Sequence, residues 1–169
     1  MRISRLSLDM QGFQIISATN GRILGKVEDL LINMKDLKVA GIVTSKGGLF
    51  DSKVEAIQRK DIQVWGEDVI LVSDPEAIYP QDNIDGFEEW SSAADQIKGR
   101  DVLNTDGEKI AELNDVVVDS IGHIVGYDLS KVFIEGPIEE SKRIHVNATQ
   151  AFGADALIID TANLYAWEM

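Results

Sequence analysis

The side chains that could do chemistry in this sequence are few and scattered. His123 lies in an expected turn and His145 in an expected strand, and neither has a second His or a Cys at the spacing of a metal site. Residues 81–86 partly resemble a calcium-binding loop, but Gln81 stands where the first Asp belongs and Ser92 where the closing Glu belongs. We therefore expect no metal and no cofactor.

Paired carboxylates are also poor candidates for acid–base catalysis. Glu88 and Glu89 are adjacent, as are Glu139 and Glu140, and neighbouring side chains of an extended chain point in opposite directions. The sequence holds no Cys, phosphate loop, dinucleotide fingerprint or nucleophile elbow. We expect a protein that is not an enzyme.

Two acidic residues stand out because a repeated segment contains them. Residues 20–33 and 106–119 follow one plan. A turn dipeptide is followed by a segment of mixed polar and apolar residues, one Asp, three apolar residues and a final polar residue. The acids are Asp29 and Asp115, which are 86 positions apart. We expect each to cap or hydrogen-bond a turn of its barrel rather than to catalyse a reaction.

The repeat extends over nearly the whole chain and divides it into two tandem units. A period of this length is too long for a solenoid and suits two small domains, which we place at residues 1–79 and 95–169 with a linker at 80–94. The repeat signature consists of turn glycines, strand glycines and acids in matching order: Gly21, Asp29, Gly41, Gly66, Asp68, Gly107, Asp115, Gly126, Gly153 and Asp155.

Short apolar runs separated by turn signals determine the expected fold class. Residues 13–17, 23–34 and 39–45 have the composition of strands, and Gly25 is the expected position of a bulge. No long amphipathic helix interrupts them. The chain is therefore predicted to be all-β, with each unit curled into a small barrel that seals its own apolar interior, and with an ordered acidic linker between the two.

Apolar residues in the loops are the candidate contacts for a partner. Leu49 and Phe50 follow a Gly-Gly turn, and they either plug one barrel mouth or form a binding tip. Phe87 and Trp90 lie in the linker, and they either dock it onto a barrel or recognise a partner. The loop that differs most between the units adds further candidates, namely Phe133, Ile134, Glu139 and Glu140.

Charge is distributed unevenly along the chain. The net charge is -13, and residues 81–169 carry most of it, which disfavours strong binding to nucleic acid. No apolar run reaches the roughly 18 residues that a membrane helix needs. We expect a cytoplasmic protein that can form a homodimer. Binding to a protein partner could place it at a membrane complex.

The repeated motif resembles the PRC-barrel family. A turn Gly, an Ile/Leu-Gly or Ile-Ala step, an Asp before an apolar triplet, an apolar-apolar-Gly strand and a closing Gly-x-Asp hairpin carry the resemblance, over residues 6–73 and 95–160. The family includes the cytoplasmic part of the photosynthetic reaction centre H subunit and the C-terminal part of the ribosome maturation factor. The resemblance implies small β-barrels that bind other proteins.

Three functions remain open at this point. The leading hypothesis is a non-enzymatic interaction or assembly module whose two barrels present loops and walls to protein partners. One alternative is association with RNA or the ribosome through the less acidic first unit, with Arg22, Lys26, Arg59 and Lys60 as contacts. The other is binding of a small ligand in the cleft between the barrels.

Overall fold

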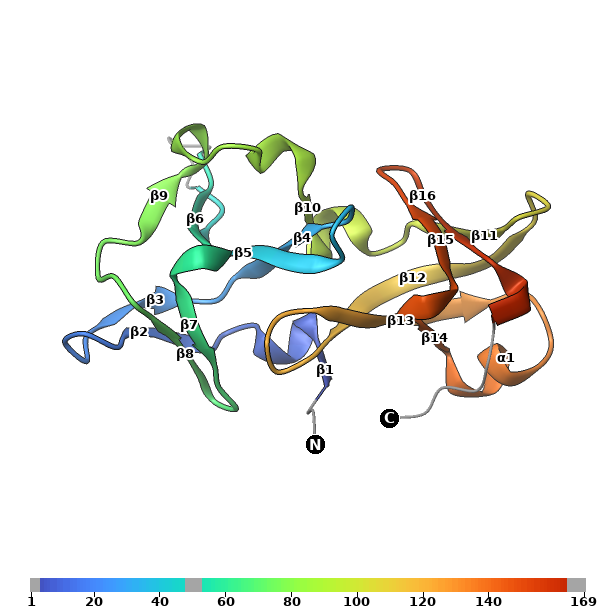
Figure 1. Cartoon of the computed structure of the whole chain (residues 1–169), viewed down its shortest axis with the longest axis horizontal. Coiled ribbons are helices and arrows are strands. Elements are labelled where there is room, and N and C mark those ends of the chain that lie inside the picture. Colours follow the sequence, from blue (N-terminus) through green and yellow to red (C-terminus); the bar gives the residue numbers. More distant parts are fainter. Residues whose placement is uncertain (1–3, 48–52, 164–169) are drawn as a thin grey trace.

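The computed structural model describes residues 4–47 and 53–163, and strands, most of them short, make up about half of it (Figure 1). The candidates Leu49 and Phe50 lie outside this range. The first half contains β1 (Arg5–Leu6), β2 (Gln14–Ser17), β3 (Ile23–Lys26), β4 (Asp29–Asn33), β5 (Lys38–Ser45), β6 (Glu55–Gln58), β7 (Ile62–Trp65), β8 (Val69–Val72) and β9 (Ile78–Pro80). The second contains β10 (Ser91–Ser92), β11 (Asp101–Asn104), β12 (Lys109–Val118), β13 (Ile124–Val132), β14 (Arg143–His145), β15 (Thr149–Phe152) and β16 (Ala156–Ile159).

Helical segments are short and connect these strands. The α-helix α1 spans Pro137–Ser141 and packs Ile138 inward. The one-turn segments are η1 (Ser7–Met10), η2 (Arg59–Asp61), η3 (Gln81–Asn83), η4 (Phe87–Glu89), η5 (Ala93–Ile97), η6 (Val146–Ala148) and η7 (Thr161–Asn163). No helix among the described residues is long and apolar enough to span a bilayer.

The two halves of the chain repeat one strand pattern. In the first half β2 pairs in parallel with β8, and in the second half β11 pairs in parallel with β16 in the matching register. Each of these parallel pairs is extended by a hairpin strand, β7 or β15. The internal repeat predicted from the sequence is thus a structural repeat, and the all-β class is confirmed.

The strand after each turn changes its partner halfway along. In the first half the change divides one expected strand into β3, which pairs with β2, and β4, which pairs with β5. In the second half β12 bends but continues, pairing with β11 early and with β13 along its length. A register shift beside Gly25 marks the expected bulge.

Each repeat gives its first strand to the other repeat. We call residues 5–10 (β1 and η1) the first arm and residues 91–97 (β10 and η5) the second arm. The first arm pairs with β12, where Leu6 lies opposite Val117. The second arm pairs with β4, where Ser92 lies opposite Leu31. Both arms lie at the centre of the elongated molecule, where the two repeats meet (Figure 1).

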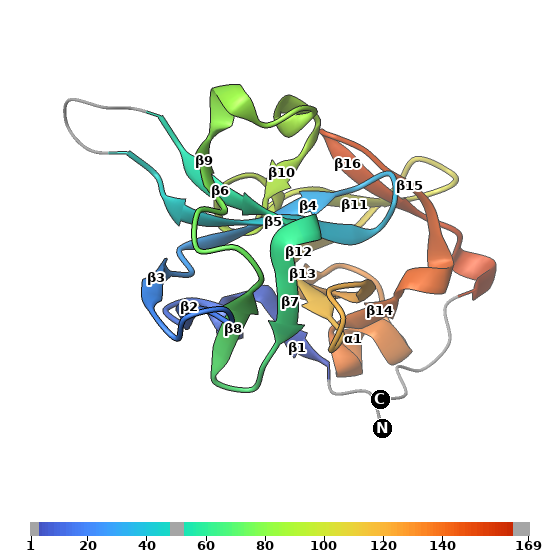
Figure 2. The same ribbon diagram turned by 60° about the vertical axis from the view of Figure 1, so that its left-hand side comes forward.

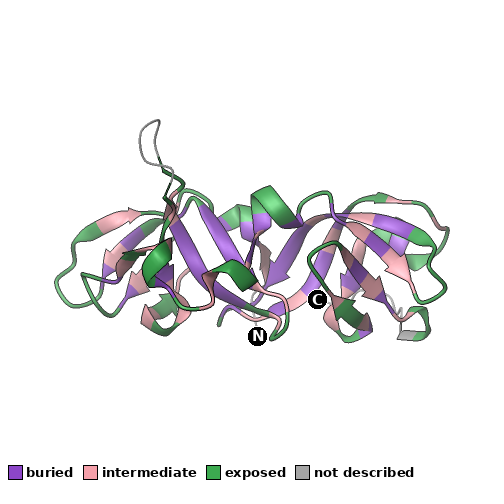
Figure 3. Cartoon of the chain, turned by 90° about the horizontal axis from the view of Figure 1, so that it is seen from above, coloured by how far each residue is buried: buried purple, intermediate pink, exposed green. Residues whose placement is uncertain are grey.

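The expectation of two closed barrels, each sealing its own interior, is wrong. The sheets are open: a five-stranded and a four-stranded sheet build the first repeat, and a seven-stranded sheet that includes β1 builds the second. One continuous apolar cluster runs through both repeats, from Ile15 and Ile42 to Val116 and Ile144. Figure 3 shows buried strand segments in both repeats. The exchange of arms explains this, because each repeat needs a strand from the other to complete its edge.

Residues 78–90 are ordered against the first repeat. β9 pairs with β6 and so forms one edge of the five-stranded sheet (Figure 2). Phe87 and Trp90 then pack on a small second cluster formed by Leu31, Val43, Ala56 and Ile84. The sequence also predicts that the C-terminal residues Leu164, Tyr165 and Trp167 pack against the protein, and these residues lie outside the described range.

Candidate functional site

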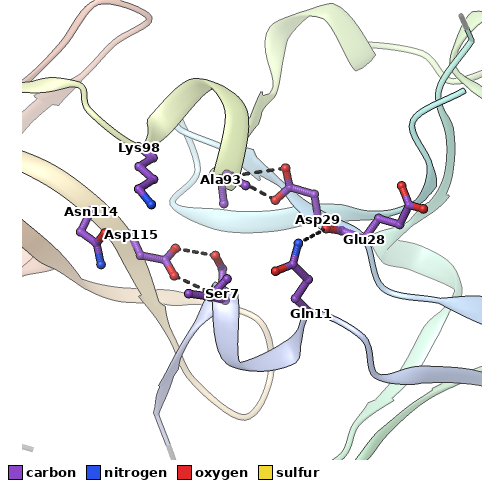
Figure 4. A pocket seen from close by; sticks show the side chains of 10 residues that line it. Ser7, Gln11, Glu28, Asp29, Ala93, Lys98, Asn114 and Asp115 are labelled. Carbon is purple, nitrogen blue, oxygen red and sulfur yellow. Dashed lines mark hydrogen bonds between the residues drawn. The ribbon is translucent and has the colours of Figure 1, made fainter.

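The junction between the repeats is built around the two repeated acids. Asp115 accepts hydrogen bonds from the Ser7 hydroxyl and, at 2.9 Å, from the Leu8 N–H. Asp29 accepts from the Ala94 N–H at 3.1 Å. Because Ala94 occupies in the second arm the place that Leu8 has in the first, the two contacts are equivalent and reciprocal (Figure 4). These donors belong to the opposite repeat, and each carboxylate also accepts the N–H of the next residue in its own strand, Leu30 at 2.8 Å or Val116 at 2.7 Å.

Burial shapes the electrostatics of these carboxylates. Asp29 and Asp115 are 5% and 4% exposed, and this desolvation raises the pKa of each above its usual value. The backbone hydrogen bonds oppose that shift, as does the Lys46 ammonium, whose Nζ lies 3.5 Å from Asp29. Lys46 also pairs with Asp95 at 2.9 Å, so it ties the end of β5 to the second arm.

A cavity of about 110 Å³ lies between the arms. It is lined by residues that match one another between the repeats: Ser7 with Ala93, Leu8 with Ala94, Gln11 with Lys98, Glu28 with Asn114, and Asp29 with Asp115. Figure 4 shows the two Asp carboxylates on opposite sides of it. The cavity thus lies on the approximate twofold axis that relates the repeats.

A second reciprocal contact joins the hairpin turns that follow β4 and β12. The Val39 N–H donates to the Gly122 carbonyl at 2.8 Å, and the Ile124 N–H donates to the Leu37 carbonyl at 2.9 Å. Leu37 and Gly122 both have a positive φ, 55° and 76°. The two turns therefore pair across the same axis as the arms.

Arg59 reinforces this second contact on one side. Its Nη1 donates to the carbonyls of Val39 and Gly122 at 3.0 Å each, and its Nη2 donates to the Ile121 carbonyl at 2.6 Å. A residue of the first repeat thus holds a turn of the second. Sequence reasoning had placed Arg59 among possible RNA contacts; the structure directs its guanidinium into the protein.

The linker aromatics border a groove on the outer face of the five-stranded sheet. The groove has a volume of about 300 Å³, an apolar floor and a rim of polar and charged residues. Its apolar lining residues are Leu31, Val43, Val54, Phe87 and Trp90. The rings of Phe87 and Trp90 are tilted against each other with centroids 6.1 Å apart. Glu88 and Asp95 add negative charge to the rim. We refer to this feature as the aromatic groove.

The remaining predicted contact residues lie at the far end of the second repeat, as the position of α1 shows (Figure 1). Phe133 is 54% exposed, and the Lys109 ammonium lies 5.4 Å from the centre of its ring. Ile134 packs partly against the main apolar cluster. Glu139 and Glu140 are exposed on α1. The structure does not bring these residues together with the aromatic groove.

The signature residues are mainly structural. Gly21 and Gly107 have φ values of 72° and 85° in their hairpin turns. A Cβ on Gly41 would lie 2.6 Å from the Ile57 carbonyl, so β6 approaches β5 too closely for any side chain there. Gly126 pairs with Val117 in the matching strand. Gly66, Asp68, Gly153 and Asp155 form the two closing hairpins.

Metal-binding side chains do not cluster in the described part of the chain. It contains no cluster of three His, Cys, Asp or Glu side chains that could hold an ion. Within the calcium-like segment, Asp82 forms an ion pair with Lys53 at 2.9 Å. His145 caps η6 by accepting the Asn147 N–H at 3.1 Å.

Sequence reasoning missed the arms as part of the site. Ser7 and Leu8 match Ala93 and Ala94 at the same offset of 86 that relates Asp29 to Asp115, and this common offset was the available signal. It indicates that the arms belong to the repeat. It does not say which repeat each arm contacts.

The repeat, the strand order and the paired acids define a tandem β-domain protein. A family model for the PRC-barrel domain matches residues 6–78 and again residues 91–163, which together cover most of the chain. The chain therefore belongs to the PRC-barrel family, with two domains in tandem. No curated protein matches it significantly.

Proposed function

We propose that this protein is a non-enzymatic interaction module that binds a protein partner through the aromatic groove. The observation that supports this most directly is the groove itself, an apolar depression formed where the segment between the repeats only partly covers the sheet. Concave apolar sites with a few polar groups are where proteins most often bind ligands and partner segments. The exchange of arms supports the same idea, because it fixes the second arm, and with it one wall of the groove, against β4.

The charge around the aromatic groove indicates the composition of the partner segment that would bind there. Glu88 and Asp95 lie at the groove, Lys46 is already paired with Asp95, and the chain as a whole carries -13 charges. A segment with a large apolar side chain flanked by Lys or Arg complements this surface. The partner is therefore an apolar and basic segment of another protein. On this proposal the protein acts as an assembly factor in the cytoplasm.

Selection of peptides that bind the full chain tests this proposal. Peptides recovered from a random displayed library should carry an apolar anchor next to basic residues. They should bind Trp90→Ala and Glu88→Lys at least about tenfold more weakly than the unchanged protein, because an interface anchor is worth about 2 kcal/mol or more. Since Glu88 is exposed, Glu88→Lys tests the groove even if Trp90→Ala is destabilised.

Two further variants serve as controls. Tyr79→Ala removes an aromatic side chain that is 38% exposed and outside the groove, and it should bind as the unchanged protein does. Phe133→Ala tests the competing surface at the far end of the molecule. Loss of binding in Phe133→Ala with full binding in Trp90→Ala and Glu88→Lys would refute the groove as the docking site.

The cavity between the arms supports a second candidate function, the binding of a small polar ligand. Its volume of about 110 Å³ suits a molecule of a few heavy atoms, and Lys98, Asn114 and the paired acids supply both donors and acceptors. Titration of the full chain with small amino acids, followed by backbone NMR, should then shift the amides of Leu8 and Ala94 together. An unchanged spectrum at millimolar concentrations would exclude this candidate.

A further inference from the structure

The four-stranded sheet of the first repeat carries a row of apolar side chains on its outer face. The strand order is β3, β2, β8 and β7, and the row consists of residues directly opposite one another in the register: Ile23, Ile16, Leu71 and Val64. Both ends of the row are open to solvent, because Ile23 is 59% exposed and Val64 is 42% exposed. Their chain neighbours Leu24 and Trp65 pack on the main apolar cluster, so the row points away from it.

The second repeat has the same sheet face, but there the face is charged. Lys109 holds the position of Ile23 in the matching hairpin register. The Lys109 ammonium forms ion pairs with Asp101 at 3.0 Å and with Glu112 at 2.8 Å. One half of a duplicated chain thus covers this face with charged groups, and the other half leaves it apolar. A contiguous apolar patch of this kind on a protein surface is typical of an interaction site.

The apolar row lies at the less charged end of the molecule. Its four strands are at one end of the elongated chain, away from β14 and α1 of the second repeat (Figure 1). Residues 1–80 carry ten Lys or Arg and eleven Asp or Glu, a net charge of -1, which leaves -12 for residues 81–169. Two molecules can therefore approach each other through their first repeats while their acidic second repeats stay far apart.

We propose that this face binds a second copy of the chain and so forms a homodimer. We call it the apolar sheet face and define it by Ile16, Ile23, Val64 and Leu71. Two sheets pack face to face about 10 Å apart with their strands nearly aligned. A twofold axis parallel to the strands lays β3 of one copy over β7 of the other, and β2 over β8. The apolar row of one copy then meets the same row of the other in the opposite order.

Charges at two corners of the apolar sheet face match in this arrangement. Lys26 is exposed at the end of β3, opposite Gln14. Asp68 is exposed in the turn before β8, next to Val69, which lies opposite Gln14 on the other side. The two charges are therefore at the same end of the strands and at opposite edges of the sheet. The twofold rotation brings Lys26 of each copy beside Asp68 of the other, and this complementarity favours a second copy as the occupant.

The size of the apolar sheet face determines the expected affinity. Four strands of four residues cover roughly 14 by 13 Å, whereas a tight dimer buries about 800 Å² on each partner. We therefore expect a weak dimer, with a dissociation constant of about 10–500 µM. The dimer carries two aromatic grooves, so it would bind a partner that has two docking segments more tightly than a monomer would.

Analytical ultracentrifugation of the full chain from about 1 µM to 1 mM tests the inference. We expect the average mass to rise from that of a monomer toward that of a dimer. Ile23→Lys, which introduces the residue type that the second repeat has at this position, should raise the dissociation constant at least about tenfold. Phe133→Ser is the matched control: Phe133 is 54% exposed in the second repeat, and its loss should leave the dissociation constant unchanged.

An exchange of charges tests the arrangement of the two copies. Lys26→Glu and Asp68→Lys should each weaken the dimer, because like charges then meet across the interface. The double variant Lys26→Glu/Asp68→Lys should recover the dissociation constant of the unchanged chain. Because the two positions lie at opposite edges of one sheet, this recovery requires contact between two copies. A double variant weaker than either single variant would overturn the proposed arrangement.

Other results would overturn the inference as a whole. They are a monomer at every concentration, or a dimer that Ile23→Lys leaves intact. Flotation with phosphatidylcholine vesicles tests a different occupant. A monomeric chain that floats with the vesicles, and no longer does so as Ile23→Lys, would assign the face to a membrane surface and refute the homodimer.

The inference goes beyond the proposed docking function and does not depend on it. Trp90 borders the aromatic groove and belongs to the segment that packs on the five-stranded sheet. Trp90→Ala should therefore dimerise as the unchanged chain does. If the library peptides fail to bind the groove while Ile23→Lys abolishes the dimer, then the groove is wrong and the homodimer stands.

Discussion

Asp29 and Asp115 hold equivalent positions in the two repeats, and each carboxylate binds the arm that belongs to the other's repeat. The Ala94 N–H lies 3.1 Å from Asp29 Oδ1, and the Leu8 N–H lies 2.9 Å from Asp115 Oδ2. The two acids thus act as a matched pair of clamps across the junction. This relationship makes the protein one interlocked body and leads to the following predictions.

Removal of one clamp should destabilise the whole chain. In Asp115→Ala the Ser7 hydroxyl and the Leu8 and Val116 N–H groups lose their acceptor, and groups left unsatisfied in a buried site cost about 1–3 kcal/mol. Urea denaturation measures this loss. Glu139→Ala, at an exposed position of α1, is the control and should change the free energy of unfolding by less than about 0.5 kcal/mol. A loss in Asp115→Ala no larger than in this control would contradict the role of the clamp.

The same two acids should make the free energy of unfolding depend on pH. Burial raises their pKa in the folded state above the ordinary value of 3.8, so the folded state binds these protons more tightly than the unfolded chain does. Their contribution to stability therefore grows as the pH falls through the folded pKa and is complete below 3.8.

The double variant Asp29→Asn/Asp115→Asn removes this titration while it keeps an acceptor at each site. Relative to the variant, the unchanged protein should gain stability as the pH falls toward 3.8. Urea denaturation of both proteins at several pH values measures the difference. A difference that stays constant with pH would show that the two carboxylates do not titrate as their burial implies.

Two glycines with similar backbones should differ in their tolerance of alanine. Gly107 and Gly122 have φ values of 85° and 76°, so alanine at either position costs about 1–2 kcal/mol in the left-handed region. A Cβ on Gly107 meets nothing within 4 Å, whereas on Gly122 it would collide with Arg59 and Trp65. Thermal denaturation should therefore show a clearly greater loss in Gly122→Ala than in Gly107→Ala. Equal losses would mean that Arg59 and Trp65 pack more loosely around the Gly122 turn than described.

Local patterns in the sequence predicted the class, the repeat and the family. The turn glycines Gly21 and Gly107, the bulge at Gly25 and the recurring Asp are set by neighbouring residues and by alternation along the strand, which the sequence contains directly. The packing of Phe87 and Trp90 could also be predicted from the sequence, because two aromatic side chains in a short acidic segment favour packing against the protein over exposure to solvent.

The exchange of arms could not be predicted from local sequence patterns, for a physical reason. Leu6 and Ser92 occupy matching positions, so either arm could add to β4 or to β12 with the same hydrogen-bond pattern. The choice depends on how the chain after each arm reaches the sheets, which is a tertiary property. The prediction of closed, self-contained barrels failed at this point. The role of Arg59 was missed likewise, because its acceptors lie in the other repeat.

Engineered disulfides test the exchange of arms most directly, since the chain has no cysteine of its own. The pairs Leu6→Cys/Val117→Cys and Ser92→Cys/Leu31→Cys join strand neighbours of the exchanged arrangement. The pairs Leu6→Cys/Leu31→Cys and Ser92→Cys/Val117→Cys join the same positions as they would meet without exchange. Oxidation under dilute conditions, followed by mass mapping, should give an intramolecular disulfide in the first two pairs and none in the last two. Efficient crosslinking of the last two pairs, with none in the first two, would contradict the interlocked structure.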